Sequence, residues 1–303
     1  MLDEKNKHLL TRTEDRISFL YIDKARIEQT EYGIQVLRGD KAIEVPITTI
    51  NCLILGPGTS ITHKAVCNIA SAGCSICFSG TDLSVFYAYG EPATNRSKNM
   101  LQQIRFHENK QLHLDVVHKM YEIRYPDSRL KTKSIEELRG IEGQRVKDCY
   151  LRCAEEYDVD WSGRSYKPDD FFSQDIVNQY LTALNHTLYA IVTAAIVSLG
   201  FSPMIGFIHT GHTQSFTFDI ADLYKEEITI PLAFALAHNG SYDRHKMLLA
   251  FRRQITEKRL MTRIVKDLLK LFYPEESTKS IEADLQLWDP KQYVKSGINY
   301  ADS

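Results

Sequence analysis

The sequence GFIHTGH at residues 206–212, followed by FTFDIADL at residues 216–223, places one imidazole and two carboxylates among mostly apolar neighbours. These are His209, Asp219 and Asp222, and together they form a ligand set suited to a hard or borderline divalent cation. Asp219 and Asp222 are three residues apart, so on a helix they share one face. A structural interpretation stays open: Asp219 as a helix N-cap and Asp222 as a first-turn carboxylate, both favoured by the helix dipole.

A third carboxylate lies upstream, inside a predicted helix. The sequence SIEE at residues 134–137 is a capping-box pattern, which indicates that a helix begins there. The apolar period through Leu138 and Val146 places Glu142 on the buried stripe of this helix. A carboxylate on that stripe is costly unless it is paired or bound to a metal.

Two glycines flank Glu142 within the same helix. Gly140 and Gly143 each cost roughly 1 kcal/mol relative to alanine inside a helix. We therefore expect either that something approaches this backbone closely or that the site must lack bulk. The alternative to a metal ligand is that Glu142 forms an ion pair with Arg139 or Arg145.

These carboxylates and the histidine suggest chemistry on phosphates. Glu142, His209 and Asp222, with or without Asp219, form a mixed oxygen and nitrogen set suited to Mg²⁺ or Mn²⁺. Such a cation can polarise a phosphodiester and stabilise an attacking or leaving oxygen.

The charge pattern agrees with a nucleic-acid substrate, although the whole chain has a net charge of −2. Residues 96–150 carry 12 Lys and Arg against 8 Asp and Glu, and residues 241–273 carry 9 against 3. A local basic surface can hold a phosphate backbone even when the whole chain is slightly acidic. The combination predicts phosphoryl transfer on nucleic acid.

The 303 residues divide by composition into two parts and a tail. We predict an α+β protein with a β-rich dimerisation domain at residues 1–90 and a linker at 91–97. A mainly α-helical catalytic domain follows at 98–273, and residues 274–303 form an acidic, mobile tail.

Hydrophobic periodicity and turn residues predict the individual elements. Strands are expected at residues 17–22, 33–37, 42–45, 50–55, 74–78 and 83–89. Helices are expected at residues 62–72, capped by Thr59 or Ser60, at 98–124, from 134 onward, at 175–199, from about Pro231 to 240, and from Asp243 to 272.

Cysteine usage and hydropathy predict a cytoplasmic protein. Six cysteines in apolar contexts are expected to be reduced. The N-terminus is polar and shows no signal peptide. The longest apolar run, residues 188–201, falls short of the ~18 residues that a membrane span needs.

Two other chemistries fit the sequence less well. A zinc site would need His63, Cys67, Cys74 and Cys77 to converge, but a two-residue gap on a strand points Cys74 and Cys77 to opposite faces. Tyr189 could be a covalent nucleophile, although a tyrosine in the core or stacked on a base agrees better with metal-type ligands.

Several motifs occur together in one order. They are LGPGT at residues 55–59, LRGIEGQRV at 138–146, WSGRSY at 161–166, GFIHTG at 206–211 and FDIAD at 218–222. In these motifs the chain resembles the CRISPR-associated integrase family, the "Cas-one" proteins, and most closely its type I-E branch. The resemblance runs from about residue 15 to residue 263.

The resemblance implies a β domain, a helical domain, a homodimer and a small "Cas-two" partner protein. It implies that Glu142, His209 and Asp222 are ligands of Mg²⁺ or Mn²⁺ and that Asp219 is a further active-site acid. The 3′-hydroxyl of captured protospacer DNA would attack a phosphodiester of CRISPR repeat-leader DNA, with endonuclease activity alongside. A nuclease for branched DNA and a non-catalytic DNA scaffold remain alternatives.

The same resemblance implies DNA contacts, which are expected at Arg164, Tyr166, Tyr189, His212 and Arg244. The chain departs from the best-known type I-E relative at four of its DNA-contacting positions. Ser60, Cys67 and Ser84 stand where that relative has arginines, and His212 stands where it has a lysine. These departures affect the expected grip on DNA and leave the metal ligands in place.

Overall fold

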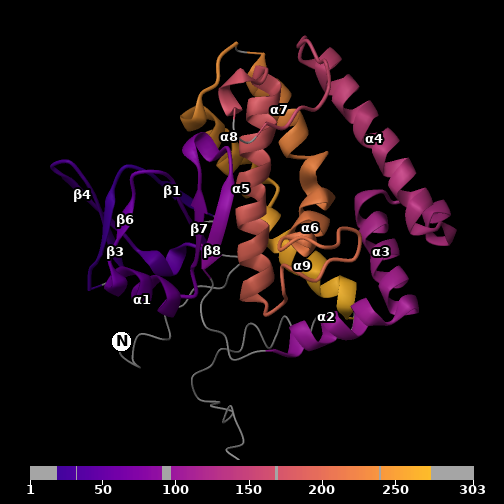
Figure 1. The fold of residues 1–303 in the computed structure, drawn as a ribbon, viewed down its shortest axis with the longest axis horizontal. Coiled ribbons are helices and arrows are strands. Elements are labelled where there is room, and N and C mark those ends of the chain that lie inside the picture. The colour runs from indigo at the N-terminus through magenta and orange to yellow at the C-terminus, as the bar shows by residue number, and fades with distance from the viewer. Residues whose placement is uncertain (1–18, 32, 91–96, 168–169, 239, 274–303) are drawn as a thin grey trace, which may run out of the picture.

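The computed structural model describes residues 19–273, except residue 32, residues 91–96, residues 168–169 and residue 239. Most of the predicted linker and the whole predicted tail lie outside the described residues. The division into a dimerisation domain and a catalytic domain stays a prediction. The order of a β-rich part followed by a helical part confirms the predicted α+β class (Figure 1).

The β-rich part contains two four-stranded sheets. The first sheet has the order β1 (Leu20–Ile22), β5 (Cys52–Leu55), β7 (Ser75–Ser79) and β8 (Phe86–Gly90). Its first three strands are parallel and β8 is antiparallel to β7. The second sheet has the order β4 (Lys41–Val45), β3 (Ile34–Arg38), β2 (Arg26–Gln29) and β6 (Ser60–Ile61).

Strand β5 explains how the two parts of the chain are joined. Cys52 and Ile54 belong to the core that the helices share, whereas Leu53 and Leu55 belong to the core on the other side of the sheet. Successive side chains of a strand point to opposite faces, so a strand covered on both faces reads as a continuous apolar run. One face of the first sheet is therefore part of the helical core.

Sequence patterns missed two strands and misplaced one helix cap. Strands β2 and β6 were not expected, because β2 carries charged residues and β6 has only two residues. Helix α1 (His63–Ser71) confirms the expected helix, but its N-cap is Thr62, whose side chain accepts a hydrogen bond from the Ala65 backbone N–H. The expectation of Thr59 or Ser60 as the cap was wrong, since Ser60 lies in strand β6.

The helical part surrounds one long central helix, α5 (Ile176–Ser198) (Figure 1). By length and composition α5 could cross a membrane, but 83% of its most apolar window is buried inside the protein. It packs against α6 (Ser215–Lys225), α7 (Thr229–Ala237) and α9 (Leu260–Phe272), and it also contacts strands β5 and β8. The central helix is thus a core element.

Two expected helices are each divided into two. The stretch 98–124 forms α2 (Lys98–Glu108) and α3 (Lys110–Arg124), because Asn109 leaves the helical conformation and its side chain caps α3. The stretch 243–272 forms α8 (Arg244–Glu257) and α9, because Arg259 adopts a left-handed conformation with φ 48°. Asp243 is the N-cap of α8, as expected.

Helix α4 (Ile135–Glu156) begins with the predicted capping box between Ser134 and Glu137. It runs along the outside of the helical part, beside α3 (Figure 1). The site described next lies where α3, α4 and α6 meet the loop before α6.

Candidate active site

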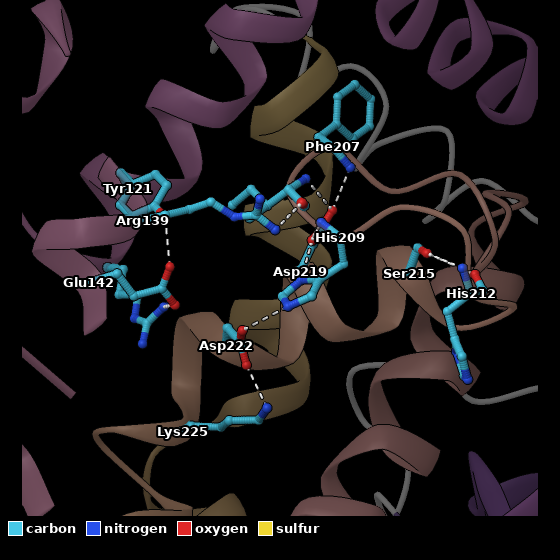
Figure 2. Close-up of polar contacts among 12 residues, drawn as sticks. Tyr121, Arg139, Glu142, Phe207, His209, His212, Ser215, Asp219, Asp222 and Lys225 are labelled. Atoms are coloured by element: carbon cyan, nitrogen blue, oxygen red, sulfur yellow. Dashed lines mark hydrogen bonds and ion pairs between the residues drawn. The ribbon is translucent and has the colours of Figure 1, made fainter. Parts of the chain in front are cut away.

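Asp219 organises the loop that precedes helix α6 (Figure 2). Its buried carboxylate accepts hydrogen bonds from the backbone N–H groups of Phe207 (2.5 Å), Ile208 (3.1 Å) and His209 (2.8 Å). Helix α6 begins at Ser215, so Asp219 lies inside the helix. The alternative that Asp219 is a helix N-cap was therefore wrong, and its carboxylate instead satisfies donors of a neighbouring loop.

The same carboxylate fixes the ring of His209. His209 Nδ1 lies 2.8 Å from Asp219 Oδ1. A carboxylate only accepts, so Nδ1 carries the proton and Nε2 of the neutral ring keeps its lone pair. The hydrogen bond that His209 donates to Asp219 raises the pKa of His209, and the nearby Asp222 adds to this effect. His209 therefore presents Nε2 as a potential metal ligand in a defined orientation.

Asp222 lies beside that free nitrogen (Figure 2). Its Oδ2 is 4.0 Å from His209 Nε2, and its Oδ1 is 2.5 Å from Lys225 Nζ. Burial disfavours ionisation of Asp222, but Lys225 and Arg124 outweigh this effect and keep its pKa below the usual value. Asp222 is thus an ionised carboxylate held next to an imidazole nitrogen.

Glu142 approaches from helix α4 but is paired with residues of α3 (Figure 2). Tyr121 donates a 2.6 Å hydrogen bond to Glu142 Oε2, and Arg124 forms an ion pair with Oε1. The alternative partners that the sequence suggested, Arg139 and Arg145, were wrong. Arg139 donates instead to the backbone carbonyl of Ile208, at 3.1 Å.

Two of the three predicted ligands, His209 and Asp222, lie close enough together to bind one Mg²⁺ or Mn²⁺ ion. Ligand atoms about 2.1 Å from one such ion lie at most about 4.2 Å apart, so His209 Nε2 and Asp222 Oδ2 are close enough to share it. Glu142, Asp219 and Asp222 line one small pocket, which has room for about one water-sized sphere. In the part of the chain that the structure describes, no three His, Cys, Asp or Glu side chains stand close enough to hold an ion as they are. The three-ligand site stays a prediction, which requires the side chains of Glu142, His209 and Asp222 to come closer together.

The glycines beside Glu142 face open space. A Cβ atom added at Gly140 or Gly143 would meet no atom within 4 Å. No described residue approaches this backbone closely, so the glycines leave an uncovered stretch of helix α4 next to Glu142.

Two of the expected DNA-contacting residues are engaged inside the protein. Arg164 donates to the side chains of Asn178 (2.8 Å) and Thr182 (3.1 Å) on helix α5. Arg244 forms ion pairs with Asp23 (2.6 Å) and Asp82 (3.2 Å) of the β-rich part.

Aromatic residues among the expected DNA contacts lie nearer the surface. Tyr166 is 52% exposed. His212 is exposed and its ring packs against Phe218, with ring centroids 5.1 Å apart. Tyr189 is partly buried, and Lys225 Nζ lies 4.9 Å from the centroid of its ring. Each DNA-contact assignment stays a prediction.

The positions that differ from the type I-E relative have different environments. Ser60 is exposed on β6 and Cys67 is exposed on α1, whereas Ser84 is buried. Cys77 Sγ lies 3.5 Å from Cys52 Sγ, and Cys67 lies near His63. The four residues of the zinc alternative form no common cluster in the described structure.

Sequence reasoning missed three residues of the site: Tyr121, Arg124 and Lys225. Lys225 could have been found, because it lies one helical turn after Asp222. Tyr121 and Arg124 belong to another helix, 21 and 18 residues before Glu142 in sequence. No local pattern indicates that helix α3 would place them there.

Comparison with known proteins gives consistent matches over this region. A family model described as "CRISPR associated protein Cas1" matches residues 121–272. A CRISPR-associated endonuclease Cas1 2 of Chlorobaculum tepidum is 38% identical over 271 residues, which cover 88% of this chain and 92% of that protein. A CRISPR-associated endonuclease Cas1 2 of Thermus thermophilus is 38% identical over 304 residues, covering 98% of this chain and 94% of that protein.

A solved structure also matches. The crystal structure of a TtCas1–DNA complex superposes with a TM-score of 0.77 at 37% identity, over 84% of this chain and 92% of that chain. The family match contains Glu142, His209, Asp219 and Asp222, and the relatives are similar to nearly the whole chain. The chain therefore belongs to the CRISPR-associated Cas1 family.

Proposed function

We propose that this chain is the integrase of CRISPR adaptation and is most like the type I-E branch. It joins the 3′-hydroxyl ends of captured DNA to the CRISPR repeat by metal-dependent transesterification, and it has an associated DNA endonuclease activity. One observation carries the proposal: Asp219 fixes His209 so that Nε2 lies 4.0 Å from the ionised Asp222. Related Cas1 proteins named endonucleases, and TtCas1 solved with DNA, support DNA as the substrate.

Each active-site residue has a defined task in this proposal. Mg²⁺ or Mn²⁺ held by Glu142, His209 and Asp222 supplies Lewis-acid activation of the phosphodiester when it is bound. Asp219 keeps the proton on His209 Nδ1, so that Nε2 is available as a ligand. Arg139 holds the carbonyl of Ile208 and so keeps the loop next to helix α4.

The partners of the reaction follow from the family and from the surface near the site. Protospacer and repeat-leader DNA would contact Tyr166 and His212, which are exposed. Arg164, Tyr189 and Arg244 would support or adjoin that surface. A homodimer joined to a small Cas-two partner protein would bring two such sites to the two ends of one captured DNA.

An integration assay tests this proposal directly. Purified protein, with and without the Cas-two partner, is mixed with labelled protospacer and repeat-leader DNA in Mn²⁺, in Mg²⁺ or in EDTA. We expect strand joining only with a divalent metal. We also expect His209→Ala and Glu142→Ala to reduce it by about 100-fold or more, because each removes a ligand. Joining in EDTA, or full joining by both variants, would refute the metal mechanism.

The assay also separates the branched-DNA nuclease from the integrase. A branched-DNA nuclease would cleave forked DNA efficiently without a repeat or a partner protein, and it would not join strands. The scaffold alternative would leave both activities absent in the wild-type protein.

A further inference from the structure

Arg124 is a buried cation among the acids of the proposed metal site, and its position suggests a specific role. Its side chain is 8% exposed and lies at the C-terminal end of helix α3. Its Nη1 donates to Glu142 Oε1. On its other side, Nε and Nη2 donate to Glu226 Oε1, at 2.9 Å and 2.6 Å. The guanidinium therefore bridges two carboxylates, one on helix α4 and one on the residue that directly follows helix α6.

The two ends of this bridge are held unequally. Two N–H groups hold the guanidinium on Glu226, and Tyr125 donates a further hydrogen bond to the same oxygen. One N–H group reaches Glu142. The contact with Glu142 can thus be broken while Arg124 stays anchored on Glu226. Arg124 and Glu142 line the same small pocket as Asp222, where a divalent ion would sit.

A guanidinium and a divalent ion compete for one carboxylate. Both are cations, and their repulsion is strong where water is largely excluded. Without an ion and without Arg124, Glu142 would lose the cation that pairs with it, whereas Asp222 would keep Lys225. A largely buried carboxylate is costly unless it is paired. We propose that Arg124 is an internal counter-cation, which neutralises Glu142 before metal binds and is displaced from Glu142 onto Glu226 by the incoming ion. This inference rests on the proposed metal site.

Two substitutions should change metal affinity in opposite directions. Arg124→Gln removes the competitor of the ion, so we expect Mn²⁺ to bind about tenfold more tightly. Glu226→Gln removes the anchor that receives the displaced guanidinium, so we expect Mn²⁺ to bind about tenfold more weakly. Tenfold is the affinity change that about 1.4 kcal/mol produces.

A double variant separates displacement from a general effect of charge. If charge alone decided, Arg124→Gln and Glu226→Gln together would cancel and give wild-type affinity. Glu226 makes its described contacts to Arg124 and Tyr125, together with a carbonyl contact to Cys149. In our proposal it acts on the ion through Arg124, so the double variant should keep the tighter binding of Arg124→Gln.

The experiment is a Mn²⁺ titration of the full chain, with free Mn²⁺ followed by electron paramagnetic resonance. Glu142→Gln identifies the site, because it should abolish the measured binding. Arg145→Gln is the matched control: it removes one positive charge next to Tyr125, whose ring centroid lies 4.4 Å from the guanidinium, without touching Glu142. Circular dichroism checks that each variant is folded. Should Arg124→Gln fail to fold, Arg124→Met replaces it in the single and the double variant, because methionine also removes the charge and keeps an unbranched side chain.

The possible results are distinct. Opposite shifts in the single variants, with a double variant like Arg124→Gln and a wild-type-like Arg145→Gln, support displacement. A double variant with wild-type affinity, unchanged single variants, or weaker binding by Arg124→Gln would each overturn it while the metal site stands. If the wild-type protein binds no Mn²⁺ that depends on Glu142, the proposed function fails and this inference fails with it.

Discussion

Asp219 fixes the geometry of the loop beside the candidate site, because its carboxylate holds three backbone N–H groups and the His209 ring. We predict that Asp219→Asn lowers the pKa of His209 towards its ordinary value. The charged acceptor that favours imidazolium is lost, although Asp222 remains nearby. An NMR titration of the imidazole resonances, assigned with His209→Gln, measures this change. An unchanged pKa would show that Asp219 does not control the ring.

The raised pKa of His209 also predicts how stability depends on pH. Because the folded state favours the protonated ring, this group stabilises the fold below its unfolded pKa, near 6.5, and the contribution is lost as pH rises through the folded pKa. Urea unfolding of the wild-type protein between pH 5.5 and 8.5 should therefore show a fall in the free energy of unfolding that His209→Gln lacks. Equal slopes for the two proteins would contradict the prediction.

Individual residues show which contacts in the candidate site the sequence could predict and which it could not. Asp219 and Asp222 share a helix, so spacing alone placed them together. The pairing of Glu142 with Arg124 could not be predicted, because it depends on how helix α3 packs on α4. Arg139 and Arg145 were predicted as partners because they are closer to Glu142 in sequence. In the structure Arg139 contacts the Ile208 carbonyl and Arg145 contacts Asp127.

Two glycines inside helix α4 lower the stability of the protein, and replacing them with alanine should restore it. Gly140 and Gly143 both face open space, so alanine fits at each position. We predict that Gly143→Ala raises the free energy of unfolding by about 1 kcal/mol, because alanine loses less backbone entropy in a helix. Chemical denaturation measures the change, and Gly140→Ala is the matched control and should give a similar gain. A loss of stability at Gly143 alone would mean that its backbone is constrained by packing the structure does not show.

Single elements also explain the errors in the predicted secondary structure. The apolar period across residues 98–124 continues through the break at Asn109, so periodicity predicted one helix where two exist. The sequence does contain a sign of the break, namely Asn109, because asparagine is a favoured N-cap and its side chain caps the second helix. The break at Arg259 has no such signal, because a left-handed backbone conformation is rare for arginine and the sequence gives no reason to expect it there.

The molecule as a whole depends on contacts that no local pattern contains. Composition predicted that a β-rich part precedes a helical part, and strand β5 shows how they are joined: its two faces belong to two cores. Arg244 at the start of α8 adds a polar link, to Asp23 and Asp82. These partners lie far from Arg244 in sequence, so only the folded chain reveals the pairing.

We predict that Arg244→Ala lowers the free energy of unfolding by about 2 kcal/mol, because Asp82 and Asp23 lose the cation that they share, although Asp23 keeps its ion pair with Arg38. Urea unfolding provides the measurement. Arg253→Ala is the control, since its ion pair with Glu257 is exposed to solvent and should contribute little to stability. A loss at Arg244 no larger than at Arg253 would show that the apolar face of the first sheet alone joins the two parts. A larger loss, accompanied by earlier proteolysis of the β-rich part, would show that the Arg244 ion pairs hold that part against the helices.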